Sequence, residues 1–286
     1  MITLKNRELT VSLAERGAEP CRIYDNVTGR DYLWLGTTEG LWRDHSPVLF
    51  PVVGIFGQGD YTVRGEKYTL PIHGFAGSSV FDAEQRSEEE AVFTLKSTSE
   101  TLKKYPFPFT FCVSYCLHDC RLETTYTVTN DGDEDMYYEI GSHGGFIMEG
   151  AMTDWRLRFE NAENRDNYTL QCNDCRLQAA KPLSGTDFPL LPSYFDMGCL
   201  TFGSLSSRVF TLESDRHPYR IRFELGSFPY LSLWQQPGAP YLCLEPWSCA
   251  SAHYAVSNAL EKQPGVTRLA PGQSHTDRYA VSMLRA

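Results

Sequence analysis

The chain has 286 residues, with 26 Lys and Arg against 36 Asp and Glu, which gives a formal net charge of −10. The acidic residues are scattered, as on a solvated surface, and this charge disfavours both nucleic acid and an anionic membrane as partners. Length alone would fit about two domains, but a large β-sandwich of this size is often one domain, which we expect to span residues 1–286.

Apolar and polar residues alternate along much of the chain, which predicts β-strands. In chain order, strands are expected at 9–13, 111–117, 122–129, 208–213, 219–225, 241–245 and 278–284, with a hairpin turn at 118–120. The only clear helical signal is residues 97–104, which Tyr105-Pro106 should end. The pattern therefore predicts an all-β protein, a large antiparallel β-sandwich that curves to form a groove.

The start of the sequence carries no signal-peptide pattern, and no segment approaches the roughly 20 apolar residues of a membrane span. We therefore expect a cytoplasmic protein. The nine cysteines are an odd number, so a disulfide framework is not expected. Cys172 and Cys175 have a Cys-x-x-Cys spacing, but no second pair follows, and free thiols are favoured over a zinc site.

Three fragments place a proton-transfer residue beside glycine, proline or an aromatic ring. His73 lies in Pro-Ile-His-Gly-Phe-Ala, His143 in Gly-Ser-His-Gly-Gly-Phe, and Glu245 in Leu-Cys-Leu-Glu-Pro-Trp. A carboxylate at the end of a buried strand gains proton affinity by desolvation and becomes a better base. The alternatives are a turn histidine, a loop histidine, and a glutamate in a salt bridge with an arginine. Only a fold that joins distant strand ends could use all three together.

Other residues carry weaker signals. Trp234 and Gln235 follow a predicted strand and could offer stacking and amide hydrogen bonds to a polyhydroxylated ligand, and Trp247 could present an apolar face. Asp196, between two aromatics and Met-Gly, could be only a turn residue. The sequence lacks a Gly-x-Gly-x-x-Gly, a phosphate-binding Gly-Lys-Ser/Thr loop and a Gly-x-Ser-x-Gly elbow. It offers no metal motif, since His73 and His143 have no identifiable partners as ligands.

Together these fragments resemble the aldose 1-epimerase (galactose mutarotase-like) family, most closely its LacX-like branch. The resemblance covers essentially the whole chain. Its further motifs, in order, are Arg-Gly-Ala-Glu-Pro at 16–20, Tyr-Leu-Trp-Leu-Gly at 32–36, Ser-Pro-Val-Leu-Phe-Pro-Val-Val-Gly at 46–54, Tyr-Pro-Phe at 105–107, Phe-Pro-Tyr-Leu at 228–231, Gln-Pro-Gly-Ala-Pro at 236–240 and Leu-Ala-Pro-Gly-Gln-Ser at 269–274.

The resemblance implies a β-supersandwich that binds an aldohexose in an open groove and interconverts its α and β anomers without a metal or organic cofactor. By motif, Glu245 would be the general base at the anomeric hydroxyl, and His143 the general acid at the ring oxygen. His73 and Asp196 match positions that hold the sugar. A monomer or homodimer is expected.

Three departures from the branch lie near the expected groove. Gly54 is followed by Ile55 where relatives usually have arginine, Gly77-Ser78 stand where Arg-Asp is common, and His143 precedes glycine where proline is usual. Arginine forks bind hydroxyl pairs and phosphates, so a phosphorylated sugar is less expected unless Arg43, Arg64 or another basic residue compensates. The departures also leave a second interpretation open, a non-catalytic carbohydrate-binding or sensing protein on the same fold.

Overall fold

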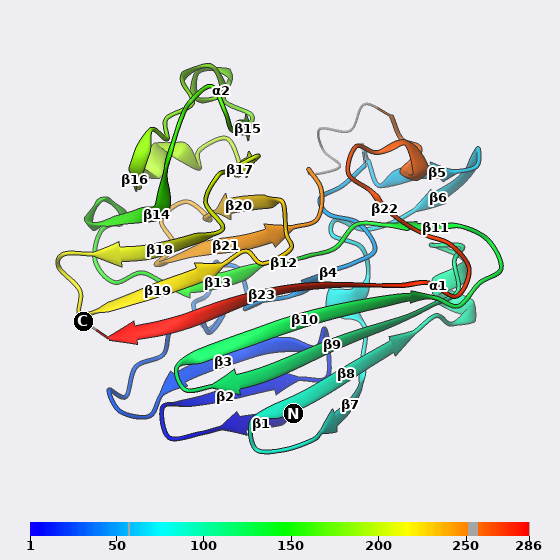
Figure 1. Cartoon of the computed structure of the whole chain (residues 1–286), viewed down its shortest axis with the longest axis horizontal. Coiled ribbons are helices and arrows are strands. Elements are labelled where there is room, and N and C mark those ends of the chain that lie inside the picture. Colours follow the sequence, from blue (N-terminus) through cyan, green and yellow to red (C-terminus); the bar gives the residue numbers. More distant parts are fainter. Residues whose placement is uncertain (57, 251–256, 286) are drawn as a thin grey trace.

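The computed structural model describes residues 1–56, 58–250 and 257–285. Antiparallel strands dominate it, and their sheets stack in a curved, two-layered arrangement (Figure 1). The described helices are short: α1 (Ser99–Leu102), α2 (Cys175–Ala180) and the 3₁₀ turns η1 (Ala76–Ser78), η2 (Met152–Asp154), η3 (Pro192–Tyr194) and η5 (Leu260–Lys262). None of these helices is both long and apolar enough to cross a bilayer. The all-β prediction is confirmed.

The largest sheet has nine strands and runs across the middle of the molecule (Figure 1). The hairpin formed by residues 109–118 and 121–130 belongs to this sheet. Buried and half-buried residues alternate along both of its strands, because successive side chains of a strand point to opposite faces. In spatial order the strands are β16 (Gly185–Pro189), β14 (Trp155–Glu163), β18 (Val209–Ser214), β19 (Tyr219–Glu224), β23 (Ser274–Arg285), β10 (Arg121–Asn130), β9 (Phe109–His118), β8 (Glu90–Lys96) and β7 (Asp82–Gln85).

A seven-stranded sheet faces the first across the core. One of its strands, β21, is buried at every position. Its Leu242 and Leu244 join the main apolar core, whereas Tyr241 and Cys243 belong to a separate cluster on the opposite face. The strands are β15 (Thr169–Gln171), β17 (Leu200–Gly203), β20 (Tyr230–Trp234), β21 (Tyr241–Trp247), β12 (Gly141–Ser142) and β4 (Val48–Leu49), with β13 (Gly144–Ile147) also paired to β21.

Smaller sheets complete the molecule. They are β1 (Ile2–Lys5), β2 (Leu9–Ala14) and β3 (Glu19–Asp25); β11 (Met136–Tyr138) with β22 (Thr267–Leu269); and β5 (Asp60–Val63) with β6 (Glu66–Thr69). The predicted strands and the hairpin are present, and so is the helical turn before Tyr105. Helix α2, which the sequence analysis did not identify, begins at an Asp174 cap. All nine cysteines are free, as expected.

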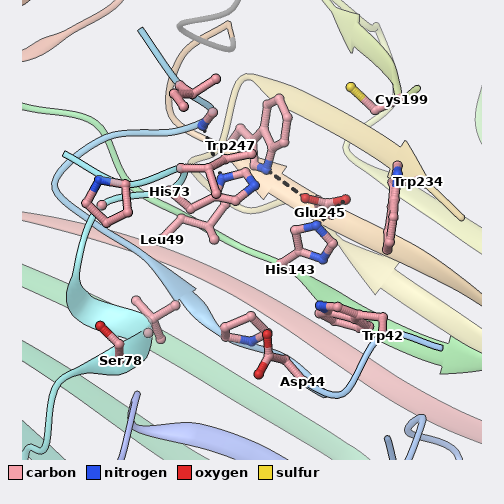
Figure 2. A pocket seen from close by; sticks show the side chains of 18 of the residues that line it. Trp42, Asp44, Leu49, His73, Ser78, His143, Cys199, Trp234, Glu245 and Trp247 are labelled. Carbon is pink, nitrogen blue, oxygen red and sulfur yellow. Dashed lines mark hydrogen bonds and ion pairs between the residues drawn. The ribbon is translucent and has the colours of Figure 1, made fainter. Parts of the chain in front are cut away.

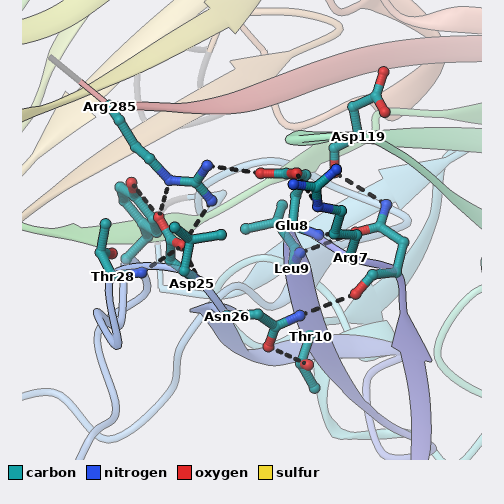
Figure 3. A network of polar contacts seen from close by, with 12 residues as sticks. Arg7, Glu8, Leu9, Thr10, Asp25, Asn26, Thr28, Asp119 and Arg285 are labelled. Carbon is teal, nitrogen blue, oxygen red and sulfur yellow. Dashed lines mark hydrogen bonds and ion pairs between the residues drawn. The ribbon is translucent and has the colours of Figure 1, made fainter.

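An ion pair between Arg285 and the buried Asp25 joins the last strand, β23, to the three-stranded sheet of β1 to β3 (Figure 3). Arg285 donates to both carboxylate oxygens of Asp25, at 2.7 and 2.9 Å, and to Glu8 at 2.6 Å. Burial alone would raise the pKa of Asp25, but the hydrogen bonds from Arg285, Thr28 and Val27 hold it well below its usual range. The pair therefore ties β23 to the turn that follows β3.

We expect Arg285→Met to lower the free energy of unfolding by about 3–5 kcal/mol at pH 7, because it leaves the buried Asp25 carboxylate unpaired. A carboxylate with a depressed folded pKa stabilises the fold above its unfolded pKa and loses this contribution as pH falls. The difference between variant and wild type should therefore shrink in acid. Urea unfolding at pH 7 and at about pH 2.5, below the unfolded pKa of about 3.9, measures both effects. Arg7→Met, at a side chain 93% exposed, is the control and should change little.

Candidate active site

A cavity of about 620 Å³ opens on the outer face of β21 (Figure 2). Glu245, His143, His73, Trp234 and Trp247 all line it, so five of the seven residues singled out as functional lie around one cavity. They come from the ends of strands and loops that are far apart in the sequence. The cavity also has a large apolar lining, which suits a ligand that is polar at its rim and apolar on one face.

Strand alternation places Glu245 in this cavity. Leu242 and Leu244 point into the main core, so Cys243, Glu245 and Trp247 point to the other side of the sheet. The carboxyl of Glu245 is 1% exposed, and its Oε2 accepts a hydrogen bond from the indole N–H of Trp247 at 3.2 Å. Burial raises the pKa of Glu245 well above its usual value, against the opposing effect of this hydrogen bond.

His143 lies between β12 and β13, beside Glu245 on β21. Its Nε2 is 3.5 Å from Oε1 of Glu245, and neither Oε1 nor the Nδ1 of His143 has a hydrogen-bond partner in the described part of the chain. Burial and the neighbouring His73 lower the pKa of His143 to about 3. No arginine among the described residues pairs with Glu245, so the alternative of an arginine salt bridge is not supported.

His73 adopts a left-handed backbone, with φ of 64°. This conformation is uncommon for a residue other than glycine, although histidine adopts it more readily than most, and such strained residues cluster at functional sites. Its Nδ1 accepts the backbone N–H of Gly54 at 3.1 Å, which assigns the proton of the neutral ring to Nε2. Burial lowers the pKa of His73 to about 4. At neutral pH, His73 can therefore donate a hydrogen bond to a ligand without carrying charge.

The loop that contacts His73 is fixed by a hydrogen bond to Glu139, a residue that the sequence analysis missed. Glu139 is 1% exposed, and its Oε2 accepts the backbone N–H of Val53 at 2.9 Å, one residue before Gly54. Burial raises the pKa of Glu139 to about 7. Gly74, with φ of 73°, packs so closely on Phe50 that a Cβ would lie 2.3 Å from the carbonyl oxygen. Glycine is therefore required beside His73.

Three tryptophans give the cavity its aromatic surface. Trp42 was not identified from the sequence; its ring centroid lies 4.9 Å from that of His143 and 5.9 Å from that of Trp234. Its backbone N–H donates to the side chain of Gln236 at 2.8 Å. A Cβ on Gly145 would lie 2.9 Å from the Trp42 ring, so this close approach requires glycine in the motif that follows His143.

Two of the proposed sugar-binding residues lie elsewhere. Asp196 is exposed and does not line the cavity, although Gly198 and Cys199 do, because Phe195 takes the buried position of that turn. Gln235 is 5% exposed, and its amide donates to the carbonyl of Ala239 at 2.8 Å, which closes the turn after β20. Their placement in this structure does not support contact with a ligand.

Several cavity residues were not identified as ligand-binding from the sequence: Arg16, Trp42, Asp44, Ser78 and Asn173. Most lie in loops without a distinctive local pattern. The structure also finds possible metal-ligand partners for His143, since its ring nitrogen, Sγ of Cys243 and an oxygen of Glu245 lie within 4.8 Å of one another. Burial raises the pKa of the Cys243 thiol well above its usual value. A cation would have to displace that proton, so the cluster does not by itself indicate a metal centre.

Comparison with known proteins identifies the family. A family profile for aldose 1-epimerase matches residues 1–282. The chain belongs to the aldose 1-epimerase family. The plasmid-encoded LacX protein of Lactococcus lactis is 30% identical, with 99% of each chain aligned. Among solved structures, a galactose mutarotase-like protein from Lactobacillus casei has a TM-score of 0.90 at 28% identity, over 99% of this chain and 100% of that one.

A second solved structure, a galactose mutarotase related enzyme from Lactobacillus acidophilus, has a TM-score of 0.86 at 26% identity. The alignment covers 99% of this chain and 97% of that one. The predicted family, LacX-like resemblance and galactose mutarotase-like fold are thus confirmed, and the family places this chain among carbohydrate epimerases.

The depressed pKa of His73 predicts how stability depends on pH. Because the unfolded histidine titrates near 6.5 and the folded one near 4, the unfolded state binds more protons between these values. Stability from this group should therefore decline as pH falls from 6.5 to 4. Chemical unfolding at several pH values should show a decline less steep in His73→Gln than in wild type, by up to about 3 kcal/mol in total. Parallel curves would contradict the buried, neutral histidine.

Proposed function

We propose that the protein is an aldose 1-epimerase that interconverts the α and β anomers of an aldohexose by acid–base ring opening. The observation that supports it most is the 3.5 Å separation of Glu245 Oε1 and His143 Nε2 inside the cavity. The anomeric hydroxyl and the ring oxygen of a pyranose are bonded to the same carbon. A base and an acid that serve both oxygens must therefore be near neighbours, each within hydrogen-bond reach of its own oxygen.

In the proposed mechanism, Glu245 removes the proton of the anomeric hydroxyl while His143 protonates the ring oxygen. The C1–O bond of the ring breaks, the C1–C2 bond rotates, and the hydroxyl attacks the other face of the aldehyde as both protons return. His73 donates from Nε2 toward the ring oxygen or a neighbouring hydroxyl. The tryptophans pack against the apolar face of the sugar.

The protonation states of the pair suit this chemistry. Burial disfavours charge on both groups, so a proton shared by the empty pair favours the carboxyl of Glu245 over the imidazole of His143. Moving that proton to His143 produces the base and acid that ring opening needs, without exchange with water. Bound hydroxyls would stabilise the charged form, because they replace hydrogen bonds that burial removed.

The whole of residues 1–286 is proposed to act as a single domain. The family profile spans 1–282, and one apolar cluster joins residues from β1 through to β23. No domain boundary is therefore needed to explain the site.

Exchange between anomers of glucose and galactose, followed by NMR magnetisation transfer, tests the proposal. We expect Glu245→Gln and His143→Asn each to lower kcat/KM by about 10²–10⁴, the usual contribution of a positioned acid or base. Glu84→Gln, at an exposed edge strand, is the matched control and should retain full activity. Unchanged exchange in either active-site variant, with unfolding midpoints like wild type, would refute the assigned roles.

A second prediction concerns Trp247→Phe, which keeps the ring but removes the N–H donated to Glu245. Because this hydrogen bond opposes the raised pKa of Glu245, its loss should raise that pKa further. The alkaline limb of the kcat/KM pH profile should move to higher pH, and kcat/KM at its maximum should fall by up to about tenfold. A profile that coincides with wild type would exclude this role.

The alternative remains a carbohydrate-binding or sensing protein that does not catalyse. Its support is that two departures from the LacX-like pattern, at Ile55 and at Gly77-Ser78, line the cavity itself. Calorimetry of sugar binding, combined with the exchange assay, separates the two functions. Tight binding of a sugar whose anomer exchange is not accelerated would favour the binding protein.

A further inference from the structure

One buried side chain joins the segment that leads to His143 to the loop of residues 50–54. Glu139 lies between β11 and β12, shortly before the chain reaches His143. Its backbone N–H donates to the carbonyl of Pro51 at 2.9 Å, and its Oε2 accepts the backbone N–H of Val53 at 2.9 Å. Two hydrogen bonds therefore fix this loop to Glu139.

The same loop fixes both the backbone and the ring of His73. The backbone N–H of Gly54 donates to Nδ1 of His73 at 3.1 Å, and the backbone N–H of His73 donates to the carbonyl of Gly54 at 2.7 Å. The carbonyl of His73 accepts the backbone N–H of Phe50 at 3.2 Å. Because Val53 and Gly54 are consecutive, a shift of the Val53 N–H away from Glu139 would also move the N–H that contacts Nδ1.

The hydrogen bond from Gly54 determines what His73 offers to a ligand. A neutral imidazole has one donor nitrogen and one acceptor nitrogen, and an N–H directed at Nδ1 leaves the proton on Nε2. The ring centroid of His73 lies 5.5 Å from that of His143 and 6.3 Å from that of Trp247 (Figure 2). If Gly54 moved, the proton could occupy Nδ1, and Nε2 would become an acceptor that cannot donate to a sugar oxygen.

A carboxyl at position 139 is costly for the fold. Glu139 is 1% exposed, and burial raises its pKa to about 7. Within residues 1–56, 58–250 and 257–285, the groups that oppose this rise are the Val53 N–H and the buried thiol of Cys249, neither of which is a cation. Buried polar groups of this kind destabilise a protein, and they concentrate where function requires them. An apolar residue would fill the position at lower cost but could not accept the Val53 N–H.

We propose that Glu139 is a positioning residue for the epimerase reaction. Acting through Val53–Gly54, it keeps His73 as a hydrogen-bond donor at Nε2. It also fixes His73 relative to the segment of His143. This inference rests on the proposed epimerase function. The described residues that line the cavity do not include Glu139, so it acts on the ligand only through His73.

A double-mutant cycle on kcat/KM for anomer exchange of glucose and galactose tests this role. Glu139→Met removes the acceptor and keeps an unbranched side chain of similar size. We expect it to lower kcat/KM by about 10–100-fold in the wild-type background, because a small displacement of a positioned group is that costly. In the His73→Gln background, where the group that it positions is already gone, the loss should be less than about threefold. Equal losses in the two backgrounds would indicate a purely structural role and overturn the inference.

The tautomer of His73 gives a readout that does not depend on turnover. In ¹H–¹⁵N spectra of the imidazole groups at neutral pH, the His73 signal, assigned by its absence in His73→Gln, should show the proton on Nε2. Glu139→Met should move the proton to Nδ1 in a detectable fraction of molecules, whereas Glu139→Gln, which keeps an acceptor for Val53, should not. An unchanged tautomer in Glu139→Met, or a changed one in Glu139→Gln, would contradict the role.

Glu163→Met is the matched control. Glu163 is also buried, at 3% exposed, and its carboxylate likewise accepts a backbone N–H, from Ser207 at 2.8 Å. It ends β14 and is not among the residues that line the cavity. We expect Glu163→Met to leave both kcat/KM and the tautomer of His73 unchanged. A loss equal to that of Glu139→Met would count against a specific role for Glu139.

Two further outcomes separate this inference from the function on which it rests. If no sugar exchanges its anomers, yet Glu139→Met changes the tautomer of His73 and Glu139→Gln does not, the positioning role stands and the epimerase proposal fails. If wild type accelerates exchange but the cycle shows no coupling between Glu139 and His73, the epimerase function stands and the inference is wrong.

Discussion

The site depends on a buried carboxyl that, among the residues the structure describes, has no cationic partner other than a histidine. Glu245 is almost fully buried, receives one hydrogen bond from Trp247 and faces His143 at 3.5 Å. Desolvation raises the proton affinity of the carboxyl and lowers that of the imidazole. Without a ligand, a shared proton therefore favours the carboxyl, and the pair is uncharged rather than an ion pair. An arginine in the same position would fix the carboxylate in its charged form and remove this property.

The sheet enforces that burial. Every residue of β21 is buried, because one face of the strand packs in the main core and the other forms the floor of the cavity. Glycines let neighbouring elements approach it: Gly145 makes room for the ring of Trp42, and Gly74 lets the segment of His73 pack on Phe50. The buried Glu139 accepts the backbone N–H of Val53, and the next backbone N–H, of Gly54, donates to Nδ1 of His73. The two histidines, whose ring centroids lie 5.5 Å apart, are thus brought together in the cavity by different segments of the chain.

The remainder of the cavity has a different character. Around Glu245 and His143 the polar groups are few and buried, whereas Arg16 and Asp44, which also line the cavity, are exposed and free of partners among the residues described. The buried groups, Glu245 and His143, suit acid–base chemistry at one carbon, because burial shifts their pKa values. The exposed groups suit recognition of hydroxyls, because their donors and acceptors are accessible to a ligand. The departures from the family pattern at Ile55 and Gly77-Ser78 fall in this same cavity, where they bear on which ligand fits.

The sequence alone determined the fold class, since period-two alternation in segments such as 9–13 and 111–129 reflects which side of a strand meets water. It also singled out His73, His143 and Glu245, which the structure brings to one cavity, because glycine, proline and a strand end beside an ionisable residue leave a local pattern. Tertiary structure decided the rest. Trp42, Asp44 and Arg16 lie in loops whose residues meet the cavity only after the sheets have paired. Asp196 and Gln235 show the reverse: their patterns suited a sugar, but burial of Phe195 and a hydrogen bond to Ala239 place them elsewhere. Local spacing fixes the direction of a side chain along a strand, whereas long-range packing fixes what that side chain faces.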